Sequence, residues 1–259
     1  MTVKKLTERY DISPLVGFLL GGACVVTVLL GDGRKLSAFL SINAFAVVVG
    51  GSLGAALIVL QSKDLPNLLA TMKGVFGWRD DPRLAVAACF SRLLSICRRH
   101  GRLKLESEIP KVPHSAQRQA VQLMVDGTEL AVIAQILEAE KEQIKRRGRV
   151  ATVFFENLGS FAPTFGIVGT VISLVSVLSH LNEPTMLAQG VAEAFIATLY
   201  GLLFANLVFL PVSMRVDALT QHETETLDMI IMGMGSLKEE EHPLLMAEKL
   251  KVFLPRSQR

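Results

Sequence analysis

Four long apolar runs constrain this chain more than any other feature of its sequence. They extend over Ile12 to Leu30, Ala44 to Leu60, Leu158 to Leu178 and Val191 to Met214. A helix needs about 20 apolar residues to cross the roughly 30 Å of hydrocarbon in a bilayer. Each run has about that length, and in hydrocarbon a helix satisfies all of its own backbone polar groups. The sequence therefore predicts an all-α, polytopic membrane protein with four transmembrane helices.

The four runs form two pairs, and a short linker joins the members of each pair. Gly31 to Asn43 separates the first two runs, and Ser179 to Gly190 separates the last two. Each pair is therefore expected to form a hairpin. The predicted segments, in order, are an N-terminal segment of residues 1–11, a first hairpin of residues 12–60, a helical domain of residues 61–157, a second hairpin of residues 158–214 and a helical tail of residues 215–259.

Lysine and arginine indicate on which side of the membrane each loop lies, because cytoplasmic loops carry an excess of them. Sixteen of the 27 basic residues lie between Gln61 and Asn157, six follow Met214, and three precede the first run. The two short linkers hold only Arg34 and Lys35. This distribution predicts that both termini and the domain of residues 61–157 are cytoplasmic.

The cytoplasmic domain has a helical pattern. Leu84 to Ile96 and Gln117 to Gln143 are apolar at helical spacing. Pro110 and Pro113 lie between them and interrupt the pattern, and Gly127 is expected to end one helix before the next begins. The tail sequence LLMAEKLKVFLP predicts an amphipathic helix that ends at its proline. These cytoplasmic helices are expected to continue the membrane helices.

Composition argues against several functional classes. Half of the residues are hydrophobic, and the mean hydropathy is +0.41, which is unlike a soluble globular protein. A net charge of +3 fits basic cytoplasmic flanks better than a nucleic-acid binder. Cys24, Cys89 and Cys97 lack the spacing of a disulfide framework or a metal site. With no nucleophile beside a base and no phosphate-binding glycine loop, we expect no enzyme, no catalytic residue, no metal site and no cofactor.

The third and fourth apolar runs each carry a face of small and hydroxyl-bearing residues. Their intervals of three and four place these residues on one side of a helix. The members are Pro163, Gly166, Thr170, Ser173 and Val177 in the third run, and Ala194, Thr198, Gly201, Ala205 and Val208 in the fourth. Such faces belong against protein or water, so they are expected to meet each other or a third partner.

Two prolines and two threonines in these runs each have two interpretations. A proline inside a helix frees a backbone carbonyl, so Pro163 and Pro211 mark either a static kink or a moving hinge. The hydroxyls of Thr170 and Thr198 either bond back to their own helix or supply oxygen ligands to a passing cation.

Charge is almost absent from the four runs. Glu193, close to the outer end of its run, is the one ionisable side chain apart from tyrosine and cysteine. A transported cation would therefore need a charge that a partner supplies. The first hairpin instead holds two G-x-x-x-G patterns, Gly17 with Gly21 and Gly50 with Gly54, which serve either packing within the chain or contacts between copies.

Several stretches together resemble the MotA/PomA/MotP family, the larger subunit of the flagellar stator. They are VVVGGSLGAALIVL, RRHGRLKLESEI, LMVDG, GSFAPTFGIVGTVISLV, ATLYGLLFANLVFLP and AEKLKVFLP, which follow one another along the whole chain. No single stretch is specific, but their order, the four runs and the length together are.

The resemblance implies a motor subunit of the bacterial inner membrane. Five copies of the chain would surround two copies of a single-span, peptidoglycan-anchored partner similar to MotB or PomB, which brings an aspartate into the ion path. Sodium ions or protons moving between ring and partner would drive rotation, and the cytoplasmic domain would pass torque to the rotor protein FliG.

The resemblance also assigns roles to individual residues. Pro163 and Pro211 match the prolines that couple ion passage to conformational change. Arg98, Arg99 and Glu106 match charged positions that face FliG, although spacing alone favours an ordinary solvated face. Thr170 and Thr198 match positions of sodium-type members, which favours Na⁺ over H⁺ because dehydrated sodium needs several oxygen ligands.

Two positions depart from the family pattern. Ser173 stands where glycine is usual, and Glu193 lies in GVAEAFIAT, which resembles the ExbB/TolQ proteins. Those proteins energise outer-membrane transport or envelope maintenance with a similar ring, and such an energiser is the alternative function. Their three spans, against four predicted here, favour the flagellar interpretation.

Overall fold

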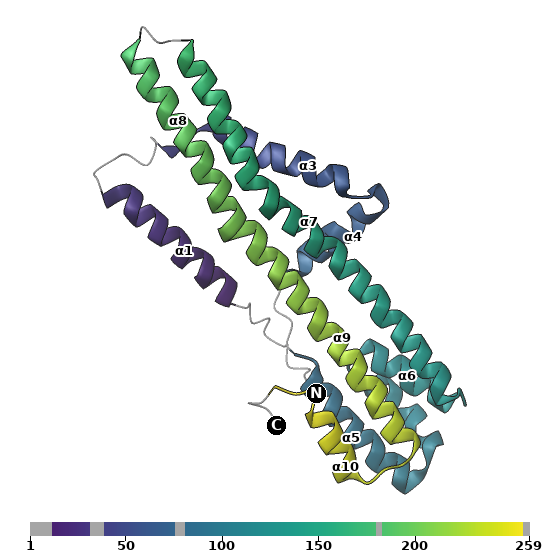
Figure 1. Ribbon diagram of the computed structural model, residues 1–259. Helices are drawn as coiled ribbons and strands as arrows, with labels where there is room; N and C mark the ends of the chain where they lie inside the picture. The colour runs from purple at the N-terminus through teal and green to yellow at the C-terminus, as the bar shows by residue number, and fades with distance from the viewer. Residues whose placement is uncertain (1–11, 32–38, 76–80, 180–182, 256–259) are drawn as a thin grey trace. The chain divides into compact units, whose positions relative to one another are not determined.

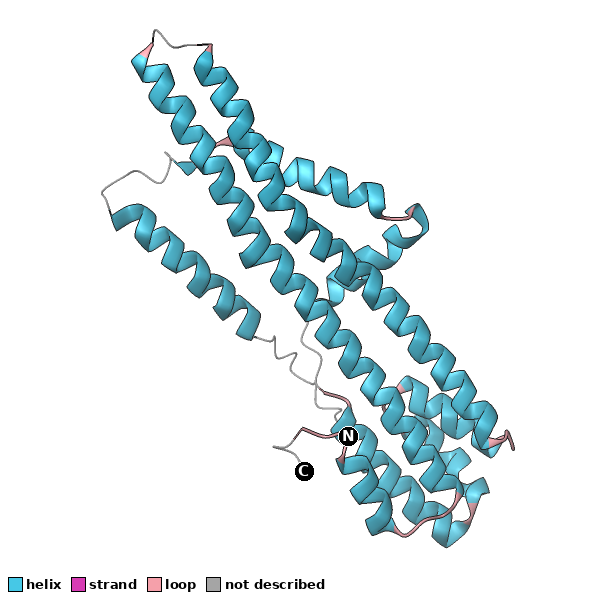
Figure 2. Cartoon of the chain, viewed as in Figure 1, coloured by secondary structure: helices cyan, strands magenta, loops and turns pink. Residues whose placement is uncertain are grey.

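The computed structural model describes residues 12–31, 39–75, 81–179 and 183–255, and the predicted N-terminal segment of residues 1–11 lies outside them (Figure 1). The chain divides into two compact units. Unit 1 comprises residues 1–78 and 147–217, and unit 2 comprises residues 79–146 and 218–259. Figure 2 shows helices throughout the described residues and no strand among them. The prediction of an all-α protein is confirmed.

Three helices are long and apolar enough to cross a membrane, and they extend over Ile42–Val59, Leu130–Leu178 and Pro184–Lys238. They cover the second, third and fourth predicted spans, the second without its last residue, Leu60. Helix α1, Ile12–Gly31, covers the first predicted span with 20 residues, about 30 Å at 1.5 Å per residue; its searched apolar stretch, Val16–Thr27, is shorter. By length and composition these helices are those of a polytopic membrane protein.

The fourth membrane helix begins earlier than predicted. Helix α8, Pro184–Leu203, starts seven residues before Val191 and has proline in its first turn. Proline is favoured there because its fixed φ suits a helix and the first turn needs no backbone donor. Polar residues between Pro184 and Val191 conceal this start from an argument based on hydropathy. Helix α7, Leu130–Leu178, ends at the predicted residue.

Two of the long helices contain a π-helical segment that sequence periodicity does not reveal. One is η2, Ala46–Gly50, between α2, Ile42–Phe45, and α3, Gly51–Val59. The other is η5, Phe204–Phe209, between α8 and α9, Leu210–Lys238. At the end of η5 the Leu210 N–H donates to the Ala205 carbonyl, five residues back. The wider turn immediately precedes Pro211, which has no N–H to donate, so the two irregularities share one place in the helix.

Unit 1 is held together by an aromatic and aliphatic core. Phe154, Phe155 and Leu158 of α7 are buried with Phe209 of η5. Leu68 of the short helix α4, Leu65–Val75, is buried in the same cluster. The side chains of residues 12–15 and 28–30 are outside the description, so α1 contributes to this account only through its middle.

Unit 2 is a small helical bundle around its own core. Its helices are α5, Arg83–His100; the 3₁₀ helix η4, Arg102–Lys111; α6, Ser115–Val125; α10, Pro243–Lys251; and the parts of α7 and α9 that belong to the unit. Phe90, Leu93 and Leu105 are fully buried in the core. Gly127, with φ +87, follows the end of α6, as predicted. Gly101, with φ +81, separates α5 from η4. An L side chain rarely adopts such a φ.

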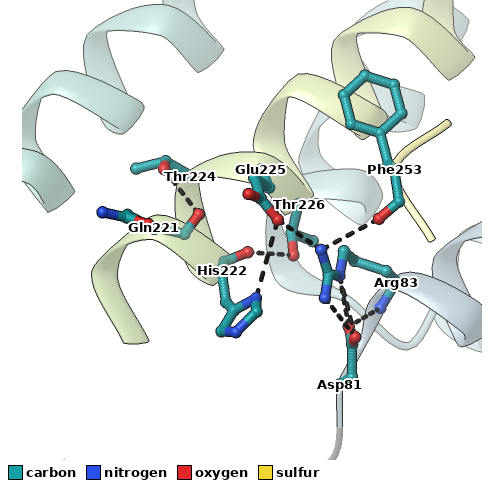
Figure 3. A network of polar contacts seen from close by, with 8 residues as sticks. All are labelled: Asp81, Arg83, Gln221, His222, Thr224, Glu225, Thr226 and Phe253. Carbon is teal, nitrogen blue, oxygen red and sulfur yellow. Dashed lines mark hydrogen bonds and ion pairs between the residues drawn. The ribbon is translucent and has the colours of Figure 1, made fainter. Parts of the chain in front are cut away.

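Arg83 joins three parts of unit 2 (Figure 3). Arg83 is 5% exposed, and its guanidinium donates to both carboxylate oxygens of Asp81, to Glu225 of α9, and at 3.0 Å to the carbonyl oxygen of Phe253, after α10. The hydrogen bonds of Arg83 hold the pKa of Asp81 below its usual value. One side chain thus fixes the start of α5, the middle of α9 and the C-terminal stretch.

We expect Arg83→Ala to destabilise unit 2 by about 2–3 kcal/mol, because charged hydrogen bonds contribute about that much and Asp81 loses its partner. Cys89 and Cys97 are buried in unit 2, whereas Cys24 is exposed. A thiol-reactive fluorophore on a Cys24→Ser background therefore reports the melting of this unit. Lys145→Ala, which removes an exposed pair with Glu142, is the matched control and should leave the melting temperature within a degree or two. Equal melting of both variants would contradict the assigned role.

Candidate functional site

The small faces of the third and fourth membrane helices meet each other. A methyl group added at Gly166 of α7 would lie 3.1 Å from the Ala197 carbonyl oxygen and 3.3 Å from the Thr198 Cα. One added at Gly201 of α8 would lie 2.7 Å from the Ala162 carbonyl oxygen and 3.1 Å from the Pro163 Cα. The two backbones are therefore in direct contact, as glycine permits between membrane helices.

The contact continues toward the Leu178 end of α7 and the Pro184 end of α8. Gly169 of α7 packs against the Ala197 methyl group, and Gly190 of α8 packs against the Val177 side chain. The Ser173 carbonyl also lies beside Gly190. One of the two arrangements left open by the sequence, in which the faces meet each other, is therefore present within a single chain.

The structure places the two prolines differently. Pro163 is half-buried inside α7, which continues as a helix on both sides of it, and its Cα lies at the Gly201 contact. Pro211 is exposed at the start of α9, directly after η5. Pro163 therefore belongs to the α7–α8 contact, and Pro211 to the irregular turn of the fourth membrane helix.

The two threonines also differ. The Thr170 hydroxyl donates to the Ile167 carbonyl at 2.6 Å and lies 3.1 Å from the Gly166 carbonyl, which is the back-bonded interpretation. Thr198 is half-buried on α8, and its hydroxyl has no hydrogen-bond partner within residues 39–75, 81–179 and 183–255. The two hydroxyls are therefore not equivalent, and that of Thr198 is the freer donor.

Glu193, whose purpose the sequence leaves open, is bound at the beginning of the second membrane helix. Its carboxylate accepts from the Ser41 hydroxyl at 2.9 Å and from the Asn43 side-chain amide at 3.2 Å. The Ser41 oxygen in turn accepts from the Ala44 N–H and caps α2. Glu193 therefore has hydrogen-bonding partners that a lone carboxylate in a membrane would lack.

Tyr200 adds a second connection to the same place, two turns along α8 from Glu193. Its hydroxyl donates to the Phe39 carbonyl at 2.7 Å and accepts from the Ser41 N–H at 3.3 Å. The start of the second membrane helix is thus held to α8 by both side chains. Sequence reasoning missed this arrangement, because the pairing joins residues about 150 positions apart.

Of the glycines singled out in the first hairpin, Gly21 packs within the chain, against the Leu207 side chain. A methyl group at Gly17, Gly50 or Gly54 would meet no described atom within 4 Å. The glycine that does make close contact in the second membrane helix is Gly51, against the Phe165 ring. Packing within the chain therefore explains Gly21 but not the other three.

The charged candidates lie in unit 2 on either side of Gly101. Arg98 and Arg99 are exposed in the last turn of α5, and Glu106 is exposed on η4. None of the three side chains forms an ion pair with a residue that the structure describes. Their side chains are thus free to contact another molecule.

Other chemistry finds no support in the part of the chain that the structure describes. No group of three histidine, cysteine, aspartate or glutamate residues within it is placed to hold a metal ion. Burial raises the pKa of the Cys89 and Cys97 thiols, which makes them poor nucleophiles.

Comparison with known proteins agrees with the fold and with the sequence resemblance. Residues 108–229 match the MotA/TolQ/ExbB proton channel family. An uncharacterized protein of Bacillus subtilis, YtxD, is 29% identical over 97% of this chain and 93% of its own length. Motility protein A of Borreliella burgdorferi is 28% identical over 94% of each chain.

The fold is similar to that of a solved motor complex. The structure of the flagellar MotAB stator complex from Bacillus subtilis contains a chain that is 25% identical to this one, with a TM-score of 0.88 over 96% of this chain and 98% of that chain. The similarity thus covers both units and all the long helices. The chain thus matches the MotA/TolQ/ExbB proton channel family over residues 108–229 and resembles motility protein A along nearly its whole length.

Proposed function

We propose that this chain is the ring-forming subunit of a flagellar stator, which uses an ion gradient to turn the rotor. The observation that carries the proposal is the full-length likeness to the MotAB stator complex and to motility protein A. The direct contact of α7 and α8, with Pro163 and Thr198 on it, supports it further.

The ion path needs a partner. Within the described membrane helices the Glu193 carboxylate is already bound to Ser41 and Asn43 and is not free to carry an ion. We infer that a single-span, peptidoglycan-anchored chain similar to MotB supplies a carboxylate, as two copies inside a ring of five. A unit charge that crosses 100 mV releases only about 2.3 kcal/mol, so torque must be summed over many ions.

We infer that the transported ion is sodium, with the proton as the alternative. Sodium gives up water only where several oxygen atoms replace it, and a hydroxyl beside the partner's carboxylate adds one. Thr198 is the stronger candidate because its hydroxyl has no partner among the described residues, whereas that of Thr170 is bonded to its own helix. No cofactor or enzymatic step is needed beyond the ion itself.

The proposed orientation places both termini and unit 2 in the cytoplasm, with the membrane helices in the bacterial inner membrane. Basic residues concentrate outside the membrane helices, most of them between Gln61 and Asn157. The free side chains of Arg98, Arg99 and Glu106 would then face FliG. Ion passage, coupled through Pro163 and Pro211, would move this surface against the rotor.

The alternative is an energiser of outer-membrane transport or envelope maintenance, similar to ExbB or TolQ. The specific observation in its favour is Glu193 within GVAEAFIAT. However, that carboxylate binds Ser41 and Asn43 of the first hairpin, so the contacts of this chain already give it a structural role. A neighbouring gene for a single-span, peptidoglycan-binding partner would favour the motor, and one for a partner with a TonB-like or TolR-like domain would favour the energiser.

Pro163→Ala is expected to abolish swimming or reduce its speed by more than half, while the protein stays in the membrane. Alanine restores a backbone donor inside α7 and removes the ring of the residue whose Cα lies at the Gly201 contact. Pro184→Ala, in the first turn of α8 where the donor is not needed, is the matched control and should swim normally. Tracking of cells that lack any second stator set provides the measurement. Normal swimming of the Pro163 variant would refute its coupling role.

Thr198→Ala is expected to raise the sodium concentration needed for half-maximal speed by about two- to tenfold, the range of one neutral hydrogen bond or ligand. Thr198→Ser keeps the hydroxyl and should behave like the unaltered protein. Thr170→Ala should have a smaller effect, since that hydroxyl is already bonded. Speed is measured against external sodium at fixed pH. If speed does not depend on sodium in the unaltered protein, the motor runs on protons.

A further inference from the structure

Leu103 is the most exposed large apolar side chain among the described residues of unit 2, at 81%, followed by Leu244 at 71%. It lies on η4 between residues that are buried or charged. A leucine in this environment gains nothing from the fold of the unit. Fully burying a leucine side chain in another molecule removes a large apolar area from water, which is the dominant favourable term in association.

The backbone holds Leu103 in this outward position. Gly101, φ +81, turns the chain into η4, and Leu105 and Ile109 are buried in the core of unit 2. Arg102 donates to the Lys238 carbonyl at 2.8 Å and lies 3.5 Å from Glu240, so the first turn of η4 is attached to the end of α9. Leu103 therefore cannot rotate into the core without breaking these contacts.

The residues close to Leu103 along the chain are mostly basic. Arg98, Arg99 and Lys104 are exposed and form no ion pair with any described residue, whereas the charge of Arg102 is matched by Glu240. Glu106 follows Leu103 by three residues, and side chains at that interval lie on one edge of a 3₁₀ helix. An apolar anchor within a rim of charge is typical of the centre of a protein interface.

We propose that Leu103 is the apolar anchor of the rotor-facing surface and inserts into an apolar recess that carboxylates flank on the rotor protein. This inference rests on the proposed stator function and adds a residue to the charged positions named above. A lipid surface is the less suitable occupant, because membrane-surface helices bury a continuous apolar face and here one leucine stands alone. A recess on a protein, by contrast, can be filled by one apolar side chain.

The test uses the full chain with its single-span partner in neutral-lipid nanodiscs, and measures binding to purified FliG at 150 mM salt. Leu103→Ala should weaken binding about tenfold or more, as for truncation of an anchor residue. Leu103→Met, of similar volume, should retain it. Leu244→Ala, the matched control on the second most exposed leucine of unit 2, should bind within twofold of the unaltered complex. Melting of unit 2 should be equal in all four proteins.

A charge variant separates the two proposals. If Arg98→Glu weakens FliG binding and Leu103→Ala does not, the anchor is refuted and the stator function stands. If the unaltered complex does not bind FliG at all, the stator proposal and the anchor both fail. If Leu103→Ala abolishes adsorption to vesicles with 30% anionic lipid and leaves FliG binding intact, Leu103 contacts membrane instead of the rotor.

Discussion

The contact between the α7 and α8 backbones is the constraint on which unit 1 depends. At Gly166 and Gly201 each helix presses against the main chain of the other, and a single methyl group would meet a carbonyl oxygen. In hydrocarbon no hydrophobic force drives helices together, so packing of this closeness is what holds the pair. Because Pro163 and Thr198 lie on the same contact, a change of helix geometry at the proline acts directly on the threonine's surroundings.

The polar groups of the protein are handled differently on its two units. In unit 1, Glu193 and Tyr200 form hydrogen bonds at the beginning of the second membrane helix, where polar groups would otherwise lack donors and acceptors. In unit 2, Arg83 collects Asp81, Glu225 and the Phe253 carbonyl around one guanidinium. Among the exposed charges of unit 2 without an ion pair to a described residue are Arg98, Arg99 and Lys104, which lie within five residues of the exposed Leu103 along the chain.

Much of the fold could be predicted from the sequence, because hydropathy and helical spacing are local signals. They located the long apolar helices, α5, the break at Gly127, and the faces of Gly166 and Gly201. The start of α8 at Pro184 was missed because proline, threonine, glutamine and glycine interrupt the apolar residues of its first two turns. The π segments were missed because an inserted residue leaves no trace in composition. The partners of Glu193 and the Gly51–Phe165 contact depend on tertiary packing between distant residues. The roles of Thr170, Thr198, Pro163, Pro211 and the charged surface stay predictions, although the two threonines are no longer equivalent.

The bonds of Glu193 also bear on how such a chain changes over evolution. The carboxylate, the Ser41 hydroxyl and the Asn43 amide satisfy one another, and Ser41 also caps α2. Loss of the acid alone would leave two polar side chains facing an apolar helix, and loss of Ser41 would leave a charge with one donor fewer. Residues in such mutual dependence are expected to covary among homologues. An acidic residue at position 193 would then be inherited together with polar residues at 41 and 43, as a single character of a lineage.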